Sequence, residues 1–253
     1  MCNNKLEGQI PEEIGRLQVL EMLYLHNNSV TGQIPASIGS LTKLNMLSLH
    51  SNRLTGTLPG ELADLNDLVY LWLGENDMTG TIPVRLGGMT NLTEMYLSKN
   101  QLTGAIPSEL GTLPYLNKLL LHHNHFTGSI PSMICQLANL TTLTLSDNML
   151  TGTIPPCLSL SLRHLVLHRN NLQGTVPSFS LHNKLEALTL FQMELYGRLS
   201  LPMSAPNLNV LMAHSNRLSC RIEANYSTAD NGDDALGYGP ILHEAHKPSQ
   251  TQK

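Results

Sequence analysis

The chain has 253 residues, of which 13% are charged and only 4% aromatic, and its formal net charge is −4. The sequence has no run rich in lysine and arginine, which argues against a nucleic-acid partner or an anionic membrane surface. No apolar run reaches the roughly 18 residues typical of a membrane helix, so we expect no membrane span in this chain.

The sequence repeats one pattern from its first residues. Met1 is followed at once by CNNKLEGQIP, which reads as the middle of a repeat, so we expect the chain to be a fragment whose N-terminus is truncated within a repeat. A glycine then recurs every 24 residues, with intervals of 22 and 23 near the end: Gly8, Gly32, Gly56, Gly80, Gly104, Gly128, Gly152, Gly174 and Gly197. A fixed period predicts one elongated body of repeating coils.

A column of asparagines accompanies the glycines. An amide side chain has two donor hydrogens and an acceptor oxygen, so stacked asparagines can satisfy backbone groups where each coil turns a corner. Met193 interrupts this column, whose other members are predicted to form a structural ladder: Asn28, Asn52, Asn76, Asn100, Asn124, Asn148, Asn170 and Asn216.

Each period also contains an L-x-L segment, such as Leu119 to Leu121, which is typical of a short strand with its outer leucines pointing inward. Ile106, Leu110, Leu113 and Leu116 complete the interior of the same coil. A single coil cannot bury this apolar set alone, so neighbouring coils must bury it for one another. We therefore predict a solenoid whose short strands stack into one parallel sheet.

The full pattern, LTGxIPxxLGxLxxLxxLxLxxNxL, resembles the plant-type leucine-rich repeats of receptor-like kinases, receptor-like proteins and secreted polygalacturonase-inhibiting proteins. The best matches are LTGTLPGELADLNDLVYLWLGEN from Leu54 and LTGAIPSELGTLPYLNKLLLHHN from Leu102, and the resemblance covers roughly residues 3 to 219. It implies a leucine-rich-repeat fold, that is, an α/β-type solenoid and right-handed superhelix with a parallel concave sheet and an extended or 3-10 convex side. The fold does not name the partner, because the same solenoid carries many partners.

Two regions follow from the pattern. Residues 1–220 are predicted to form the solenoid with about nine strands. Its last repeat is degenerate, since Leu199 and Ser200 replace Ile-Pro and Cys220 replaces the glycine. Residues 221–253 are polar and lack periodicity, so we expect a disordered tail, although a linker or a misread exon would look the same.

The concave face is where recognition is expected, because its outward side chains have no core to pack against. Tyr24, Tyr70, Trp72 and Tyr96 are predicted to form a binding patch there, with Glu94 and Lys118 beside it. Aromatic residues are enriched in binding hot spots, but strands also favour them for packing alone. Further acidic and basic residues along this face form a mild gradient or a plain solvated surface: Glu75, Lys99, Arg163 and Arg169.

Histidines share one outward column after the strands: His26, His50, His122, His168 and His214, with His123 beside them. His26 and His50 lie one strand apart, but without a third ligand they make a poor metal site, so we expect no metal. A pH-sensitive interface is the alternative interpretation.

Cys135 and Cys157 fall on the convex segments of successive coils, and a similar pair occurs in the plant receptor-like repeats. Stacking favours a disulfide and an oxidising compartment, the alternative being two free buried thiols. Cys2 and Cys220 lie at opposite ends and cannot meet. Glycosylation sequons begin at Asn27, Asn91, Asn139 and Asn225, a number close to chance.

The sequence predicts a binding module without a catalytic function or a cofactor. The resemblance implies a location on the extracellular face of the plasma membrane or secretion. The expected partner is a protein, peptide or glycan, or another leucine-rich-repeat ectodomain. Any kinase would lie elsewhere in the parent protein. Two alternatives stay open, a secreted inhibitor of a cell-wall hydrolase and a cytosolic scaffold. A hydrolase using Glu75 and Glu94 is disfavoured because an open face encloses no substrate.

Overall fold

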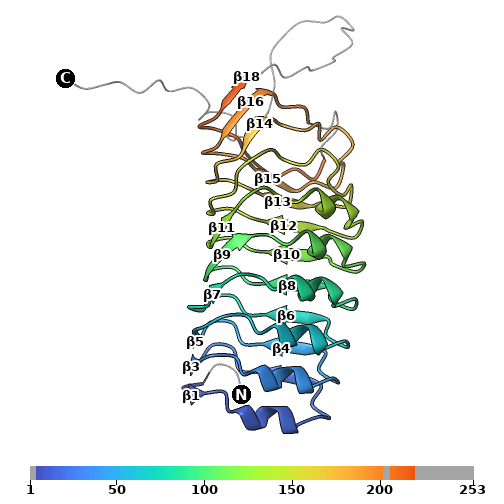
Figure 1. Ribbon diagram of the computed structural model, residues 1–253. Coiled ribbons are helices and arrows are strands. Elements are labelled where there is room, and N and C mark those ends of the chain that lie inside the picture. Colours follow the sequence, from blue (N-terminus) through green and yellow to red (C-terminus); the bar gives the residue numbers. More distant parts are fainter. Residues whose placement is uncertain (1–3, 202–205, 220–253) are drawn as a thin grey trace, which may run out of the picture.

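The computed structural model describes residues 4–201 and 206–219, which wind into coils stacked along one axis (Figure 1). The predicted tail 221–253, together with Cys2, Cys220 and Asn225, lies outside these residues. Within the described part, the helices are short 3-10 turns, and none is long and apolar enough to cross a membrane.

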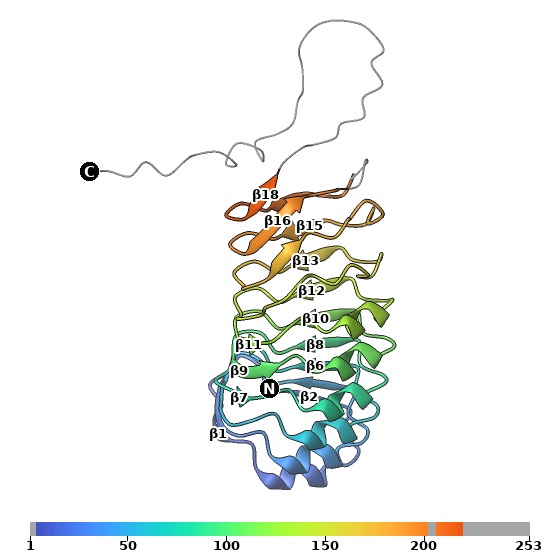
Figure 2. The same cartoon turned by 45° about the horizontal axis from the view of Figure 1, so that its top comes forward.

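One parallel sheet of nine strands runs the length of the stack and forms the concave face. Its strands follow one another in chain order (Figure 2) and are β2 (Met22–Tyr24), β4 (Met46–Ser48), β6 (Tyr70–Trp72), β8 (Glu94–Tyr96), β10 (Lys118–Leu120), β12 (Thr142–Thr144), β13 (His164–Val166), β15 (Ala187–Thr189) and β17 (Val210–Met212). Equivalent residues of neighbouring coils pair, so Leu71 lies between Leu47 and Met95. Side chains therefore form columns across the sheet.

A second set of short strands lies along another edge of the coils, in three sheets of three. These strands are β1 (Glu7–Gln9), β3 (Ser29–Gly32), β5 (Arg53–Leu54), then β7 (Thr79–Gly80), β9 (Gln101–Ala105), β11 (His125–Thr127), then β14 (Gln173–Thr175), β16 (Glu194–Arg198) and β18 (Arg217–Ser219). The repeated glycine falls in this region with a positive φ, for example 76° at Gly104, which explains why this column requires glycine.

The convex side of the first six coils is formed by five-residue 3-10 helices: η1 (Glu12–Arg16), η2 (Ala36–Ser40), η3 (Gly60–Asp64), η4 (Val84–Gly88), η5 (Ser108–Thr112) and η6 (Ser132–Gln136). Each begins after the repeated proline, whose extended backbone (φ −60° and ψ 133° at Pro107) turns the chain onto this side. Among the described residues, the coils after η6 contain no such helix, and this is where the period shortens to 22 and 23 residues.

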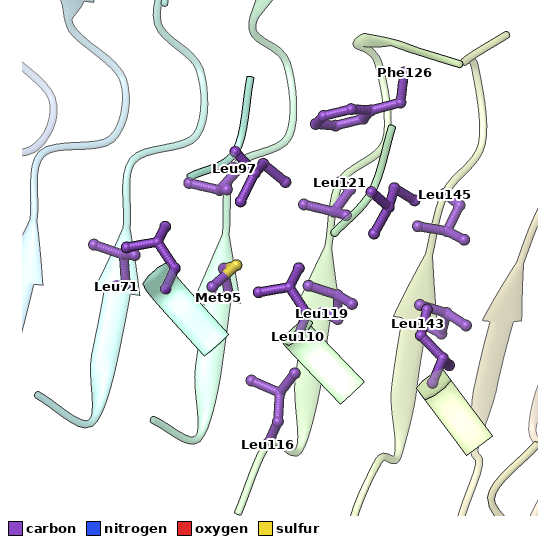
Figure 3. Packing of buried hydrophobic residues seen from close by; sticks show 14 of the residues in the cluster. Leu71, Met95, Leu97, Leu110, Leu116, Leu119, Leu121, Phe126, Leu143 and Leu145 are labelled. Carbon is purple, nitrogen blue, oxygen red and sulfur yellow. The ribbon is translucent and has the colours of Figure 1, made fainter. Parts of the chain in front are cut away.

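The core is one continuous apolar column between the two sides. In Figure 3, Leu71, Met95, Leu119 and Leu143 come from consecutive strands of the concave sheet and point into the same interior. Leu110 approaches them from η5 on the convex side and Leu116 from the turn before β10, and all of these side chains are buried. The leucine pattern is therefore the core pattern of the fold.

The asparagine side chains join each coil to the one before it. Asn100 is typical: its Nδ2 donates to the carbonyls of Leu97 (3.1 Å) and Leu73 (3.2 Å), and its Oδ1 accepts from the backbone N–H of Met78 (3.0 Å). The same arrangement recurs at Asn52, Asn76, Asn124, Asn148, Asn170 and Asn216. Asn28 bonds its own coil through Leu25 and the preceding coil through Leu6.

On the convex side, Cys135 of η6 and Cys157 of the next coil form a disulfide, with their Cα atoms 5.2 Å apart. The bond links residues 22 positions apart, and closing a loop of that size stabilises a fold by about 3 kcal/mol in the chain-entropy model. It lies where the 3-10 helices stop, so it fastens the shorter coils to the regular ones.

Replacing Asn100 with alanine should lower the free energy of unfolding by about 3 kcal/mol or more. The change leaves the buried N–H of Met78 without an acceptor, which costs about 1 to 3 kcal/mol. It also removes one of the two amide donors from the carbonyls of Leu73 and Leu97, which keep only those of Asn76 and Asn124, at about 0.5 to 1.5 kcal/mol for each lost bond. Urea denaturation followed by circular dichroism measures the loss. Asn66→Ala is the control, since the side chain of exposed Asn66 bonds within its own turn, to the Asp64 carbonyl. Equal stability of the two variants would contradict a structural role for the ladder.

Candidate functional site

The first and third residues of each concave strand point away from the core, because the middle residue points into it. The pairing register places Tyr70 beside Glu94 and Trp72 beside Tyr96 on this open face. Glu94 in turn lies beside Lys118 of β10. The residues predicted for the binding patch therefore come from β2, β6, β8 and β10 and share two neighbouring columns.

Aromatic and imidazole rings form one connected cluster on this face, which we call the aromatic patch and define as Tyr24, His26, His50, Tyr70, Trp72 and Tyr96. Its ring centroids are 5.8 Å apart for Tyr70 and Trp72, and 6.2 Å and 6.0 Å from His50 to Trp72 and Tyr96. His26 stacks on His50 at 4.6 Å, and Tyr24 meets the edge of His26 at 6.0 Å. Tyr24 thus reaches the other predicted aromatics only through the two histidines.

The indole of Trp72 is held in place by a short polar chain. Its Nε1–H donates to Oε2 of Glu94 (3.2 Å), and the other oxygen of Glu94 pairs with the Lys118 ammonium (2.9 Å). Glu94 and Lys118, which the sequence places in the site, therefore orient the largest ring of the patch.

Tyr96 fits a notch left by Gly74. A Cβ built on Gly74 would lie 2.3 Å from Cζ of Tyr96, so only glycine leaves room for the ring. The Tyr96 hydroxyl bonds Glu75, and burial together with this carboxylate raises the pKa of Tyr96 to about 12. Hydrogen bonds from Lys99 and then Ser51 lower the pKa of Glu75 to about 2. The notch was not foreseen, because a missing side chain gives no signal until the neighbouring coil is placed.

The histidine column is a second ladder, made of imidazoles and hydroxyls. Nδ1 of a histidine meets the hydroxyl of the next coil at His26 and Ser48 (2.9 Å), His122 and Thr144 (2.9 Å), and His168 and Thr189 (2.9 Å). Burial lowers the pKa of His122 to about 4 and lowers that of His168. Among the described residues, no three histidine, cysteine or acidic side chains are close enough to hold a metal ion.

A smaller stack of rings, which the sequence-based predictions did not single out, lies toward the C-terminal end. Phe191 lies between His168 and His214, with ring centroids 4.1 Å and 4.8 Å away and the rings nearly parallel. The Arg169 guanidinium lies 5.7 Å from the Phe191 centroid and also bonds Asp147. Phe191 occupies the histidine column, so aligning the columns would have revealed it.

Two features differ from a simple open face. Met46 and Ser48 occupy outward-pointing strand positions, yet both are buried. The His26 ring, which is hydrogen-bonded to the Ser48 hydroxyl, covers Ser48, and both residues pair with the large residues Tyr70 and Trp72 of β6. The charges do not form a gradient, because they are engaged in local pairs such as Lys99 with Glu75 (2.7 Å). Glu75 and Glu94 are each tied to a lysine, so they do not form a carboxylate pair.

An open groove of about 1200 Å³ runs along the flank that precedes the strands. It shares Tyr70 and Glu94 with the face described above, and exposed Tyr115 lies in it between two sequon residues, Asn91 and Asn139. The third sequon residue, Asn27, lies on the concave side, directly after His26, with a φ of 55°.

Three family models match the chain. Residues 2–102 match a leucine-rich repeat region, residues 90–150 a leucine rich repeat, and residues 161–183 a third leucine rich repeat model. No curated protein matches significantly.

Solved structures give closer detail. The ectodomain of the Arabidopsis thaliana receptor kinase GASSHO1/SCHENGEN3, in complex with Casparian strip integrity factor 2, is 35% identical with a TM-score of 0.81, and the match covers 85% of this chain and 26% of that one. For the Arabidopsis receptor kinase HAESA, in complex with the peptide hormone IDA and the co-receptor SERK1, the values are 33%, 0.79, 86% and 37%.

A plant ice-binding protein is 26% identical with a TM-score of 0.64, and the match covers 87% of this chain and 82% of that one. The fold alone therefore does not fix what is bound. This chain spans about a quarter to under two fifths of the two receptor ectodomains. Family models and structures agree on the repeat itself, and the chain belongs to the leucine-rich-repeat family, in the plant type found in the ectodomains of receptor kinases.

Proposed function

We propose that this chain is part of the extracellular recognition region of a receptor-like kinase or receptor-like protein, and that it binds a peptide or protein partner through the aromatic patch. The observation that carries the proposal is the connected cluster of rings on the open face of the sheet. Aromatic side chains with fixed orientations dominate binding energy at protein interfaces. Glycans and other leucine-rich-repeat ectodomains are the further partner classes that suit such a surface.

The setting of the patch supports this role. The rings are half-buried and already held by neighbours, so binding costs little side-chain ordering. The two similar receptor ectodomains are in complex with Casparian strip integrity factor 2 and with the peptide hormone IDA and the co-receptor SERK1. The face is open rather than enclosed, which suits the recognition of an extended partner and gives no means of excluding water for a reaction.

The disulfide bears on where the protein acts. Disulfides persist in oxidising compartments, so the bond between Cys135 and Cys157 favours a secreted or cell-surface location over a cytosolic scaffold. A secreted inhibitor of a cell-wall hydrolase would share that location, and binding at the patch by an isolated hydrolase would favour this alternative.

Peptides selected against the full chain from a random peptide library displayed on phage should depend on Trp72 and Tyr96. Replacing both residues with alanine should weaken the selected peptides about 30-fold or more, because two ordered aromatic anchors are worth about 2 kcal/mol or more. Surface plasmon resonance gives the affinities. Tyr115→Ala removes a more exposed ring from the neighbouring groove and should have little effect. If Tyr115→Ala weakened the peptides and the double variant did not, the binding site would lie in the groove and not in the patch.

Gly74→Ala should weaken the same peptides about tenfold while the protein stays folded. The new methyl group occupies the notch and forces the Tyr96 ring out of its place beside Glu75. Gly88→Ala is the matched control, since a Cβ on Gly88 meets nothing within 4 Å. Equal peptide affinities for the two alanine variants would show that the position of the Tyr96 ring in the notch at Gly74 does not matter for binding.

We propose that Asn27, Asn91 and Asn139 carry N-linked glycans. Asn91 and Asn139 are exposed, and each Nδ2 donates one hydrogen to a backbone carbonyl, of Asn66 and Pro114 (both 2.9 Å), so a glycosylated amide can keep that bond. When the chain is expressed behind a secretion signal in plant cells, Asn91→Gln with Asn139→Gln should lower the intact mass by two glycans. Asn66→Gln, which lies outside any sequon, should not. An unmodified mass for the secreted wild-type chain would contradict the proposal.

A further inference from the structure

Two imidazoles lie side by side within the aromatic patch. His26 follows β2 and His50 follows β4, and the register of these strands places the rings nearly parallel (7°) with centroids 4.6 Å apart. Tyr24 stands at the edge of His26, while Trp72 and Tyr96 lie about 6 Å from His50. Aromatic rings thus bound the pair on the sides formed by the concave sheet.

Hydrogen bonds assign different tautomers to the two rings. The Ser48 hydroxyl is buried and meets Nδ1 of His26 at 2.9 Å, so it donates to that nitrogen and leaves the His26 proton on Nε2. The Ser51 hydroxyl donates to the Glu75 carboxylate (2.7 Å). Its oxygen therefore accepts from Nδ1–H of His50 (3.1 Å), and Nε2 of neutral His50 carries a lone pair.

The two Nε2 atoms are the unused polar groups of the pair. Among the described residues neither has a hydrogen-bond partner, and neither is an enclosed atom, so both face solvent on the open side. Nε2 of His26 is a donor and Nε2 of His50 is an acceptor. One added proton, on Nε2 of His50, would turn them into two parallel donors on neighbouring coils.

We propose that the His26 and His50 pair binds a carboxylate of the partner, which accepts one hydrogen bond from each Nε2–H while His50 takes up one proton. This inference rests on the proposed function and names the chemistry of the ligand at that site. The carboxylate lies next to an apolar or aromatic group, because Tyr24, Trp72 and Tyr96 surround the pair. A charge-assisted pair of hydrogen bonds fixes the orientation of such a group.

The charges around the pair decide how many protons it takes. The titratable and charged groups packed near it in the described residues are Tyr24, Glu75 and Tyr96, with Lys99 and Glu94 bonded behind Glu75 and Trp72. Burial and the neighbouring His26 lower the pKa of His50, and Glu75 opposes them. His50 is therefore neutral near pH 7 in the unliganded protein. Two stacked cations would repel each other, so binding draws in one proton.

A bound carboxylate stabilises the proton on His50 and so raises the pKa of that residue. Affinity for a carboxylate must then rise as the pH falls, by a factor of up to about ten for each pH unit in the range where one proton is taken up. The slope vanishes once the pH is low enough for the free protein to hold that proton already. A neutral ligand of the same shape gains nothing from the proton.

The test uses phenylacetate as the probe and phenylacetamide, its neutral analogue, as the matched control. Imidazole nitrogen and carbon-bound proton signals of the full chain are followed by NMR as each compound is added between pH 8 and pH 5.5, a span set by the ordinary pKa of about 6.5 for histidine. Phenylacetate should shift the signals of His26 and His50, with an affinity that increases toward low pH, and phenylacetamide should leave them unchanged. Equal binding of both compounds, or phenylacetate binding without a pH dependence, would overturn the proposal.

Variants separate this pair from the rest of the histidine column. His50→Asn should reduce phenylacetate affinity at least tenfold and remove its pH dependence. His26→Asn should also reduce the affinity at least tenfold but keep the pH dependence, because the proton is taken up by His50. His122→Asn should not, since His122 has its Nδ1 between Ser98 and Thr144 and lies outside the patch. Undiminished binding by both patch variants would also refute the assignment, and circular dichroism confirms that each variant is folded.

The outcomes distinguish this inference from the proposed function. If the phage-selected peptides require Trp72 and Tyr96 while phenylacetate fails the test, the patch binds partners without using the histidine pair for a carboxylate. If phenylacetate behaves as expected while the peptides ignore Trp72 and Tyr96, the anion site exists and the wider patch is not the partner surface.

Discussion

The hydrogen bonds of the asparagine ladder are the constraint on which the rest of this structure depends. Each buried amide donates to a carbonyl of its own coil and to one of the preceding coil, as Asn100 does with Leu97 and Leu73. It also accepts from the backbone N–H two positions after the asparagine of the preceding coil, which for Asn100 is that of Met78. These bonds fix the rotation of each coil on its neighbour. With the rotation fixed, equivalent strand residues must pair, and every side chain on the concave face falls into a column. The aromatic patch exists because Trp72 and Tyr96 are held in one such column.

Within those columns the polar groups largely satisfy one another, and this shapes what remains for a partner. Imidazoles bond hydroxyls of the next coil, and glutamates bond lysines or the Trp72 indole. Unsatisfied polar atoms would be costly where rings cover them, so the sheet resolves most of its own hydrogen bonding. What it leaves open is ring surface and a few nitrogen atoms, of which Nε2 of His26 and of His50 lie closest to the rings.

Much of this could be predicted from the sequence, for a physical reason. A 24-residue period fixes which residues stack, so the core leucines and the parallel sheet follow from alignment of the repeats alone, whereas the resemblance to plant leucine-rich repeats indicates an extended or 3-10 convex side. The period says less about side chains that cross from one coil to the next. Burial of Met46 and Ser48 depends on large neighbours in β6 and on the His26 ring. The place of Tyr96 depends on the absence of a side chain at Gly74, which is visible only once both coils are in position.

An open sheet of this kind constrains chemistry as well as recognition. Catalysis needs groups that stay reactive in a site closed to water, but here Glu75 is held ionised by Lys99 and Ser51, and Glu94 is committed to Trp72 and Lys118. A binding surface gains from the same arrangement, because side chains that neighbours already hold lose little freedom when a partner arrives. The network that removes reactivity from these carboxylates is therefore what prepares the rings beside them for binding. Selectivity must then come from the particular residues in each column, since the coils that carry them are nearly identical.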